Sequence, residues 1–100
     1  MAATLDNVIE TLRTHEGELR RFGVSHTAVF GSVARGEAQA GSDVDVLVEL
    51  DADRPIGIFE YARLKLYIDE ILNGVSHVVN RRTLKPLLRD SILRDAVYAF

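Results

Sequence analysis

Residues 29–50 read VFGSVARGEAQAGSDVDVLVEL, and this stretch decides the fold. The run HTAVFG that leads into it is short, apolar and β-branched, which predicts a strand that stops at Gly31. A small, polar spacer follows, which predicts a turn with one helical turn at 33–35. The run DVDVLVEL then alternates, with Asp43, Asp45, Leu47 and Glu49 on one face and aliphatic residues on the other, which predicts a second strand.

The remaining sequence predicts three helices and a third strand. Apolar residues recur at helical spacing over 4–22, 58–72 and 83–100, and VSHVV at 75–79 is typical of a short strand. We expect Thr83 to cap the last helix and Pro86 to lie in its first turn. This order of elements predicts one α+β domain over residues 1–100, a small mixed β-sheet with helices packed mainly on one face.

The composition narrows the class of protein. Hydrophobic residues make up 47% and charged residues 27% of the chain, as in an ordinary soluble protein. The absence of cysteine excludes disulfides and thiolate metal sites. With no signal peptide and no long apolar span, we expect a cytoplasmic protein that does not enter a membrane. The net charge of −3 argues against direct binding to a polynucleotide, but it permits a small phosphorylated ligand held with a divalent cation.

Gly31-Ser32 is a candidate phosphate cradle. A strand that ends in Gly-Ser and turns toward a helical segment exposes backbone N–H groups, and glycine lets a ligand approach closely. The serine hydroxyl adds a donor. The alternative is a plain turn, because Gly-Ser is common in turns.

Asp43 and Asp45 are a candidate metal site. They project from one face of the predicted strand, roughly 6–7 Å apart at Cα, and like charges this close repel unless a cation lies between them. Mg²⁺ held through carboxylate and phosphate oxygens would relieve the repulsion. The alternative is a solvated strand start with two free carboxylates. Because Ser32 lies eleven residues upstream with a strand on each side, we expect the turn and the two carboxylates to lie together.

The stretch GSVARGEAQAGSDVDVLVEL resembles the signature of the minimal nucleotidyltransferases of the DNA polymerase β superfamily. The resemblance continues through LKLYIDEIL and the C-terminal segment, and it covers nearly the whole chain. It implies nucleotidyl transfer, with Asp43 and Asp45 holding Mg²⁺ or Mn²⁺. Gly31 and Ser32 would bind the β- and γ-phosphates of ATP, and pyrophosphate would leave. Arg35 would add a phosphate contact; the alternative for Arg35 is a solvated surface arginine.

One position departs from that signature. The family typically has a third acidic residue on the strand after the long helix, and here the matching residue is His77. A neutral imidazole suits Mg²⁺ poorly. Three interpretations stay open: a working substitute that favours Mn²⁺ or Zn²⁺, a site that binds nucleotide but transfers slowly or not at all, or a structural histidine. Glu49 shares the face of Asp45 but lies roughly 13 Å along the strand, too far to substitute.

The resemblance also implies a partner. Standalone members are often antitoxins that transfer AMP to a tyrosine of a small helical toxin of the HEPN type. The alternative is a weakened or inactive member that binds its partner by contact alone, and a homo-oligomer is also compatible with the sequence. On the last predicted helix we expect one stripe to be core, namely Leu84, Leu87, Leu88, Ile92 and Ala96. A second stripe, Leu93, Val97 and Phe100, is either core or an exposed patch for a partner.

Overall fold

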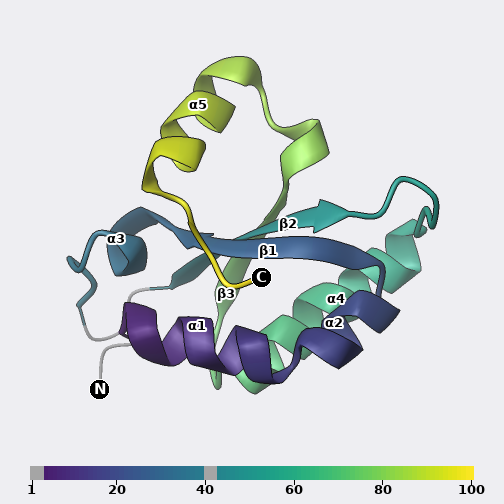
Figure 1. Cartoon of the computed structure of the whole chain (residues 1–100), viewed down its shortest axis with the longest axis horizontal. Helices are drawn as coiled ribbons and strands as arrows, with labels where there is room; N and C mark the ends of the chain where they lie inside the picture. The colour runs from purple at the N-terminus through teal and green to yellow at the C-terminus, as the bar shows by residue number, and fades with distance from the viewer. Residues whose placement is uncertain (1–3, 40–42) are drawn as a thin grey trace.

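The computed structural model describes residues 4–39 and 43–100, and these build one mixed four-stranded sheet (Figure 1). The strand order is β3-β2-β1-β4. The middle strands β1 and β2 are antiparallel, β3 runs parallel to β2, and β4 is antiparallel to β1. The strands are β1 (Val24–Phe30), β2 (Val44–Leu50), β3 (Ser76–Asn80) and β4 (Val97–Tyr98).

Helices cover the two faces of the sheet unequally. In Figure 1, α1, α2 and α4 lie together beneath the sheet, and α5 lies on the opposite side with the short turn that precedes it. This arrangement confirms the predicted α+β fold with helices mainly on one face. The helices are α1 (Leu5–Thr14), α2 (Glu16–Arg21), α3 (Gly31–Ala34), α4 (Ile58–Ile71) and α5 (Pro86–Asp95), with a 3₁₀ turn η1 (Arg81–Thr83) before α5.

The main core lies between the sheet and the helices α1, α2 and α4. Strand β2 buries its aliphatic positions here, as its alternation predicted. Leu12 of α1 and Ile68 of α4 are fully buried against them, and each such side chain contributes roughly 1.5–3 kcal/mol. The opposite face of β2 carries Asp45, Leu47 and Glu49. We call this side of the sheet the α5 face.

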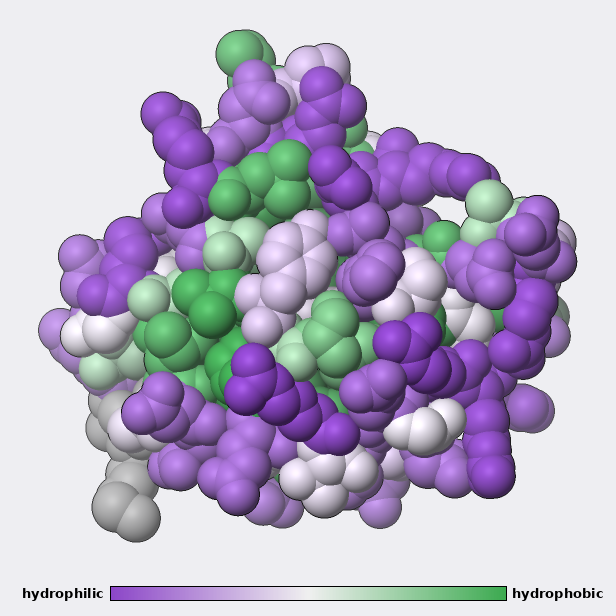
Figure 2. Space-filling view, in the orientation of Figure 1, coloured by the Kyte–Doolittle hydropathy of each residue, from purple (hydrophilic) through white to green (hydrophobic). Residues whose placement is uncertain are grey.

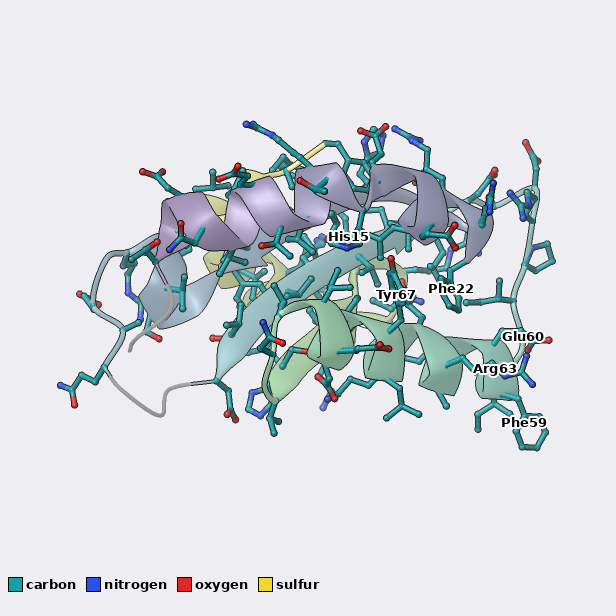
Figure 3. The ribbon with its side chains drawn as sticks, turned by 90° about the horizontal axis from the view of Figure 1, so that it is seen from below. His15, Phe22, Phe59, Glu60, Arg63 and Tyr67 are labelled. Carbon is teal, nitrogen blue, oxygen red and sulfur yellow. The ribbon has the colours of Figure 1, made fainter. Side chains whose placement is uncertain are left out.

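The first predicted helix, 4–22, is broken at His15. Helix α1 ends at Thr14 and α2 begins at Glu16. The Thr14 hydroxyl donates to the Glu10 carbonyl, a side-chain bond that competes with the helical ladder. The His15 ring lies edge-on to Tyr67 with centroids 6.1 Å apart, and Phe22 packs on the same tyrosine at 5.3 Å (Figure 3). The break therefore brings an aromatic cluster between the helix pair and α4.

The prediction of one helix over 83–100 is wrong at its C-terminal end. Helix α5 ends at Asp95, and Val97–Tyr98 forms β4 beside β1. The Ala99 N–H donates to the Thr27 carbonyl at 2.8 Å, and Ala99 is buried. The β-branched and aromatic residues here thus complete the sheet at the edge of β1, which the local helical spacing could not indicate.

The start of that helix also differs from the prediction. Thr83 is not the cap, because its hydroxyl donates to the Asn80 carbonyl and Lys85 occupies the N-cap position. Pro86 is the first helical residue, as expected.

The stripe predicted as core on this helix is not core. Leu87 is 87% exposed and Leu88 is 56% exposed, and no residue of α5 is buried. The reason is that α5 stands off the sheet instead of lying on it.

The face shown in Figure 2 is hydrophilic around its rim, with hydrophobic residues gathered between α5 and α1. Val97 of the second predicted stripe is 39% exposed and lines a hollow with residues of α1, whereas Phe100 packs against the core. No helix in the described residues is long and apolar enough to cross a membrane.

Candidate active site

Three neighbouring strands bring the predicted site residues to one end of the sheet. In the β1–β2 register Phe30 lies opposite Asp45, and in the β2–β3 register Asp45 lies opposite His77. The Gly31-Ser32 turn follows Phe30 directly. The turn, the start of β2 and the start of β3 are therefore side by side, although 46 positions separate Gly31 from His77.

Gly31 is constrained by both its backbone and its neighbour. Its φ of +71° lies in the left-handed region that favours glycine. A Cβ at this position would overlap the Asp45 carboxylate. The turn can approach the acidic strand this closely only because Gly31 has no side chain.

His77 lies between the two aspartates. Its Nε2 is 3.1 Å from Oδ2 of Asp43, and its Nδ1 is 3.4 Å from Oδ1 of Asp45. The side chains are 64% exposed for His77, 41% for Asp43 and 25% for Asp45, so solvent reaches all three. Both ring nitrogens carry a proton only in the imidazolium form, and that form would offset the repulsion between the carboxylates.

Ser32 and Arg35 differ in whether their side chains are already hydrogen-bonded to other residues. Ser32 lies in α3 and is half-buried, and its hydroxyl forms no hydrogen bond with any residue that the structure describes. The Arg35 guanidinium is bound by Glu37 at 2.8 Å and by Asp95 at 2.6 Å. These hydrogen bonds raise the pKa of Arg35 above its ordinary value. Arg35 thus joins α3 to the end of α5, and phosphate would have to compete with two carboxylates.

Comparison with known proteins assigns this chain to a family. The sequence model of the nucleotidyltransferase domain matches residues 12–99. The chain belongs to the nucleotidyltransferase domain family. The protein adenylyltransferase MntA of Thermococcus cleftensis is 38% identical over 96 residues, covering 95% of each chain. The expected resemblance and the expectation of a nucleotidyltransferase are thereby confirmed.

Solved structures of nucleotidyltransferases share the fold. One assigned as a minimal nucleotidyltransferase is 40% identical with a TM-score of 0.71, over 89% of this chain and 93% of that chain. A chain from the complex of a tri-AMPylated Shewanella oneidensis HEPN toxin with MNT antitoxin has a TM-score of 0.65 at 14% identity, over 92% of this chain and 71% of that one. At that identity the second likeness shows the fold alone.

The nucleotidyltransferase domain offers two carboxylates to a hard cation. Mg²⁺ is usually bound by one or two carboxylates together with substrate phosphates, so Asp43 and Asp45 fit this ion. In the structure, one oxygen of Asp43 and one of Asp45 lie 3.1 and 3.4 Å from the His77 ring. The ring would have to move away before these oxygens could bind the ion. Within residues 4–39 and 43–100, no three acidic or histidine side chains are arranged to hold a metal. Gly41 and Ser42 of the signature lie outside the described residues.

A residue that sequence reasoning missed fixes the start of β3. Asp69 of α4 accepts hydrogen bonds from the backbone N–H of Ser76 at 2.8 Å, from its hydroxyl at 2.6 Å, and from Lys65. Partial burial raises the pKa of Asp69, but the hydrogen bonds from Lys65 and Ser76 outweigh it and leave the pKa below its ordinary value. Ser76 is fully buried and directly precedes His77. The only sequence signal was the i, i+4 spacing of Lys65 and Asp69.

Glu49 lies at the other end of the nucleotidyltransferase sheet. It accepts hydrogen bonds from the Tyr98 hydroxyl at 2.5 Å and from Arg81 at 3.1 Å. Partial burial and the bond to Glu49 raise the pKa of Tyr98 to about 12. Glu49 is therefore engaged in a separate cluster on the α5 face.

Proposed function

We propose that this protein transfers AMP from ATP to a hydroxyl group of a partner protein in the cytoplasm. The observation that carries the proposal is the strand register, which places the Gly31-Ser32 turn beside Asp45 and Asp45 beside His77. The relative from Thermococcus cleftensis that is named as a protein adenylyltransferase supports AMP as the transferred group.

In this proposal the first turn of α3 holds the triphosphate. The Ser32 hydroxyl, which has no partner among the described residues, would donate to a β- or γ-phosphate oxygen, and Gly31 would let the phosphates approach the backbone. Asp43 and Asp45 would hold Mg²⁺, or Mn²⁺ in its place. The bound ion would neutralise phosphate charge and lower the pKa of the attacking hydroxyl.

The transfer itself is a displacement at the α-phosphorus. The acceptor oxygen forms a bond to the α-phosphorus, the bond to the bridging oxygen breaks, and pyrophosphate leaves. The acceptor hydroxyl loses its proton in this step. A ring nitrogen of His77, once it no longer contacts the carboxylates, would accept this proton in the proposed step.

The proposed partner is a small helical protein of the HEPN type. The structural likeness to a chain from a HEPN toxin and MNT antitoxin complex supports this assignment at the level of the fold. The exposed leucines Leu87 and Leu88 on α5 are compatible with contact to a second protein.

A second candidate function is partner binding with little or no transfer. The observation that favours it is the contact of His77 with both aspartates, because the ring occupies the space where a cation would lie. In that case the protein would neutralise its partner by contact.

One experiment separates these functions. The purified protein is incubated with labelled ATP, a candidate HEPN-type partner protein, and either Mg²⁺ or Mn²⁺. Transfer of label that disappears in Asp43→Asn and Asp45→Asn would support the enzyme. Tight binding of the partner without label under either metal would exclude transfer and leave the binding role.

A further inference from the structure

The C-terminal ends of the parallel strands β2 and β3 carry a basic groove that the proposed chemistry does not use. It has a volume of about 340 Å³ and is lined by Glu49, Leu50, Asn80, Arg81, Arg82 and Arg89. We call these six residues the arginine groove. Two further hollows adjoin it and share Leu50 and Asn80 with it. The hollows therefore form one continuous depression around the ends of the two strands.

The charge of this region is opposite to that of the chain as a whole. Residues 81–95 contain five basic and two acidic side chains, a net charge of +3 in a chain whose net charge is −3. Within the groove only Arg81 has a close carboxylate partner, Glu49. Arg82 has no side-chain partner among the described residues, and the nearest carboxylate to Arg89 is Asp90 at 4.0 Å. Two exposed guanidinium groups are thus available to an anionic ligand.

The adjoining hollows add apolar surface. One of about 320 Å³ is lined by Ile56, Ile58 and Tyr61 besides the shared residues. Ile58 is 81% exposed and Phe59 is 80% exposed. Figure 3 shows Phe59 pointing away from the body of the protein at the start of α4. A ligand with both carboxylates and apolar side chains would match this combination.

The distance between the arginine groove and Asp45 determines which part of a bound ligand could reach the candidate active site. Glu49 lies four residues after Asp45 on the α5 face of β2, roughly 13 Å along the strand. An extended polypeptide covers the same distance in about four residues. Polynucleotide is a poorer match, because Asp43 and Asp45 at the other end of that face would repel its continuous phosphate backbone.

We propose that the arginine groove binds an acidic segment of the acceptor protein that also carries apolar side chains. The segment places an acceptor hydroxyl about four residues away, at Asp43 and Asp45. This inference rests on the proposed AMP transfer. It adds a specificity element, because acceptors with carboxylates at this spacing would be preferred over neutral ones.

The test uses a fluorescein-labelled peptide that carries a block of four glutamates, two leucines, and a tyrosine four residues from the block. A matched peptide has glutamine in place of glutamate. We expect the protein to bind the acidic peptide roughly tenfold more tightly in fluorescence anisotropy, a difference of about 1.4 kcal/mol. The double variant Arg82→Glu/Arg89→Glu should lose this preference. Both residues are exposed, so the fold should persist.

The control for charge is Arg20→Glu/Arg21→Glu on α2, which makes the same change of charge outside the arginine groove, at side chains that pair with Glu16 and Glu18. It should keep the preference for the acidic peptide. The proposal is overturned if the unaltered protein binds both peptides equally, if both double variants weaken binding alike, or if an oligothymidylate displaces the peptide at lower concentration than the unlabelled peptide does.

Calorimetry with ATP and Mg²⁺ separates this result from the proposed function. The Arg82→Glu/Arg89→Glu variant should bind the nucleotide as the unaltered protein does, because neither arginine lies at the Gly31-Ser32 end of the sheet. An unaltered protein that binds the acidic peptide but not ATP would refute the transfer and leave the groove assigned. ATP binding without peptide preference would refute the groove alone.

Discussion

Replacing His77 by aspartate tests whether the three strands form one ion site. The substitution would place a third carboxylate where the ring nitrogens now lie 3.1 and 3.4 Å from Asp43 and Asp45. Without a cation, three negative charges would then face one another. With a divalent cation, all three would become ligands.

The loss of stability expected for His77→Asp depends on how exposed the side chain at position 77 is. Two unit charges 4 Å apart interact by about 1 kcal/mol in water and about 4 kcal/mol at an effective dielectric constant near 20. Because the His77 side chain is 64% exposed, the lower value applies to each of the two new repulsions. The lost histidine pairings add less than about 1 kcal/mol, since exposed pairs contribute little. The variant should therefore be about 2 kcal/mol less stable without metal, which lowers Tm by roughly 10 °C in a domain of this size.

The assay is calorimetric unfolding in EDTA and in millimolar Mg²⁺. A cation present at one hundred times its Kd restores about 2.7 kcal/mol, so Mg²⁺ should return most of the lost stability to His77→Asp. The matched control is His77→Asn, which adds no charge; it should lose only the histidine pairings, less than about 1 kcal/mol, and show no recovery with Mg²⁺. A His77→Asp variant that is as stable as the unaltered protein in EDTA and indifferent to Mg²⁺ would refute the reasoning.

Three further changes have defined outcomes. In Gly31→Ala the new methyl group would overlap the Asp45 carboxylate, at a positive φ that disfavours alanine. We expect the free energy of unfolding in urea to fall by roughly 1–2 kcal/mol and Mg²⁺-dependent ATP binding to be lost in calorimetry. Normal ATP binding would contradict the close approach of the turn to Asp45. Asp69→Ala leaves two donors of buried Ser76 unpaired and should lower the free energy of unfolding by roughly 3 kcal/mol in urea titration, against a negligible loss for exposed Asp90→Ala. The pKa of Tyr98, raised from 10.0 to about 12, means that its protonated form stabilises the fold below pH 10 and that this contribution is lost as pH rises through 12. The Tm of Tyr98→Phe should thus approach that of the unaltered protein across this interval, and a gap that stays constant with pH would contradict the assignment.

The middle of the fold was predictable because its signals are local and strong. The alternation in 43–50 fixed which face of β2 is buried, and the glycine at the end of the preceding apolar run fixed where β1 stops. Once both strands were placed, antiparallel pairing brought Gly31-Ser32 to the acidic end. The placement of His77 followed from the family resemblance and from a third strand beside β2.

The C-terminal segment was not predictable from local spacing. The apolar residues between 84 and 100 fit a helical stripe, yet β4 forms because β1 offers Val97 and Tyr98 a free edge. Helix α5 keeps Leu87 exposed for a tertiary reason as well, since it stands away from the sheet and is joined to α3 through Arg35 and Asp95. A contact between residues 60 positions apart leaves no local pattern.

Because β3 is anchored, the His77 substitution changes the side chain at this position but leaves the backbone in place. Asp69 holds Ser76 by two hydrogen bonds, and the parallel pairing with β2 fixes the following residue opposite Asp45. The backbone at position 77 is therefore set by contacts that do not involve its own side chain. A shorter carboxylate placed there faces the same two aspartates, whatever its effect on the ion. If His77→Asp binds Mg²⁺ yet transfers no AMP, the missing element lies in the nucleotide or acceptor contacts, and the third side chain of the site is not the cause.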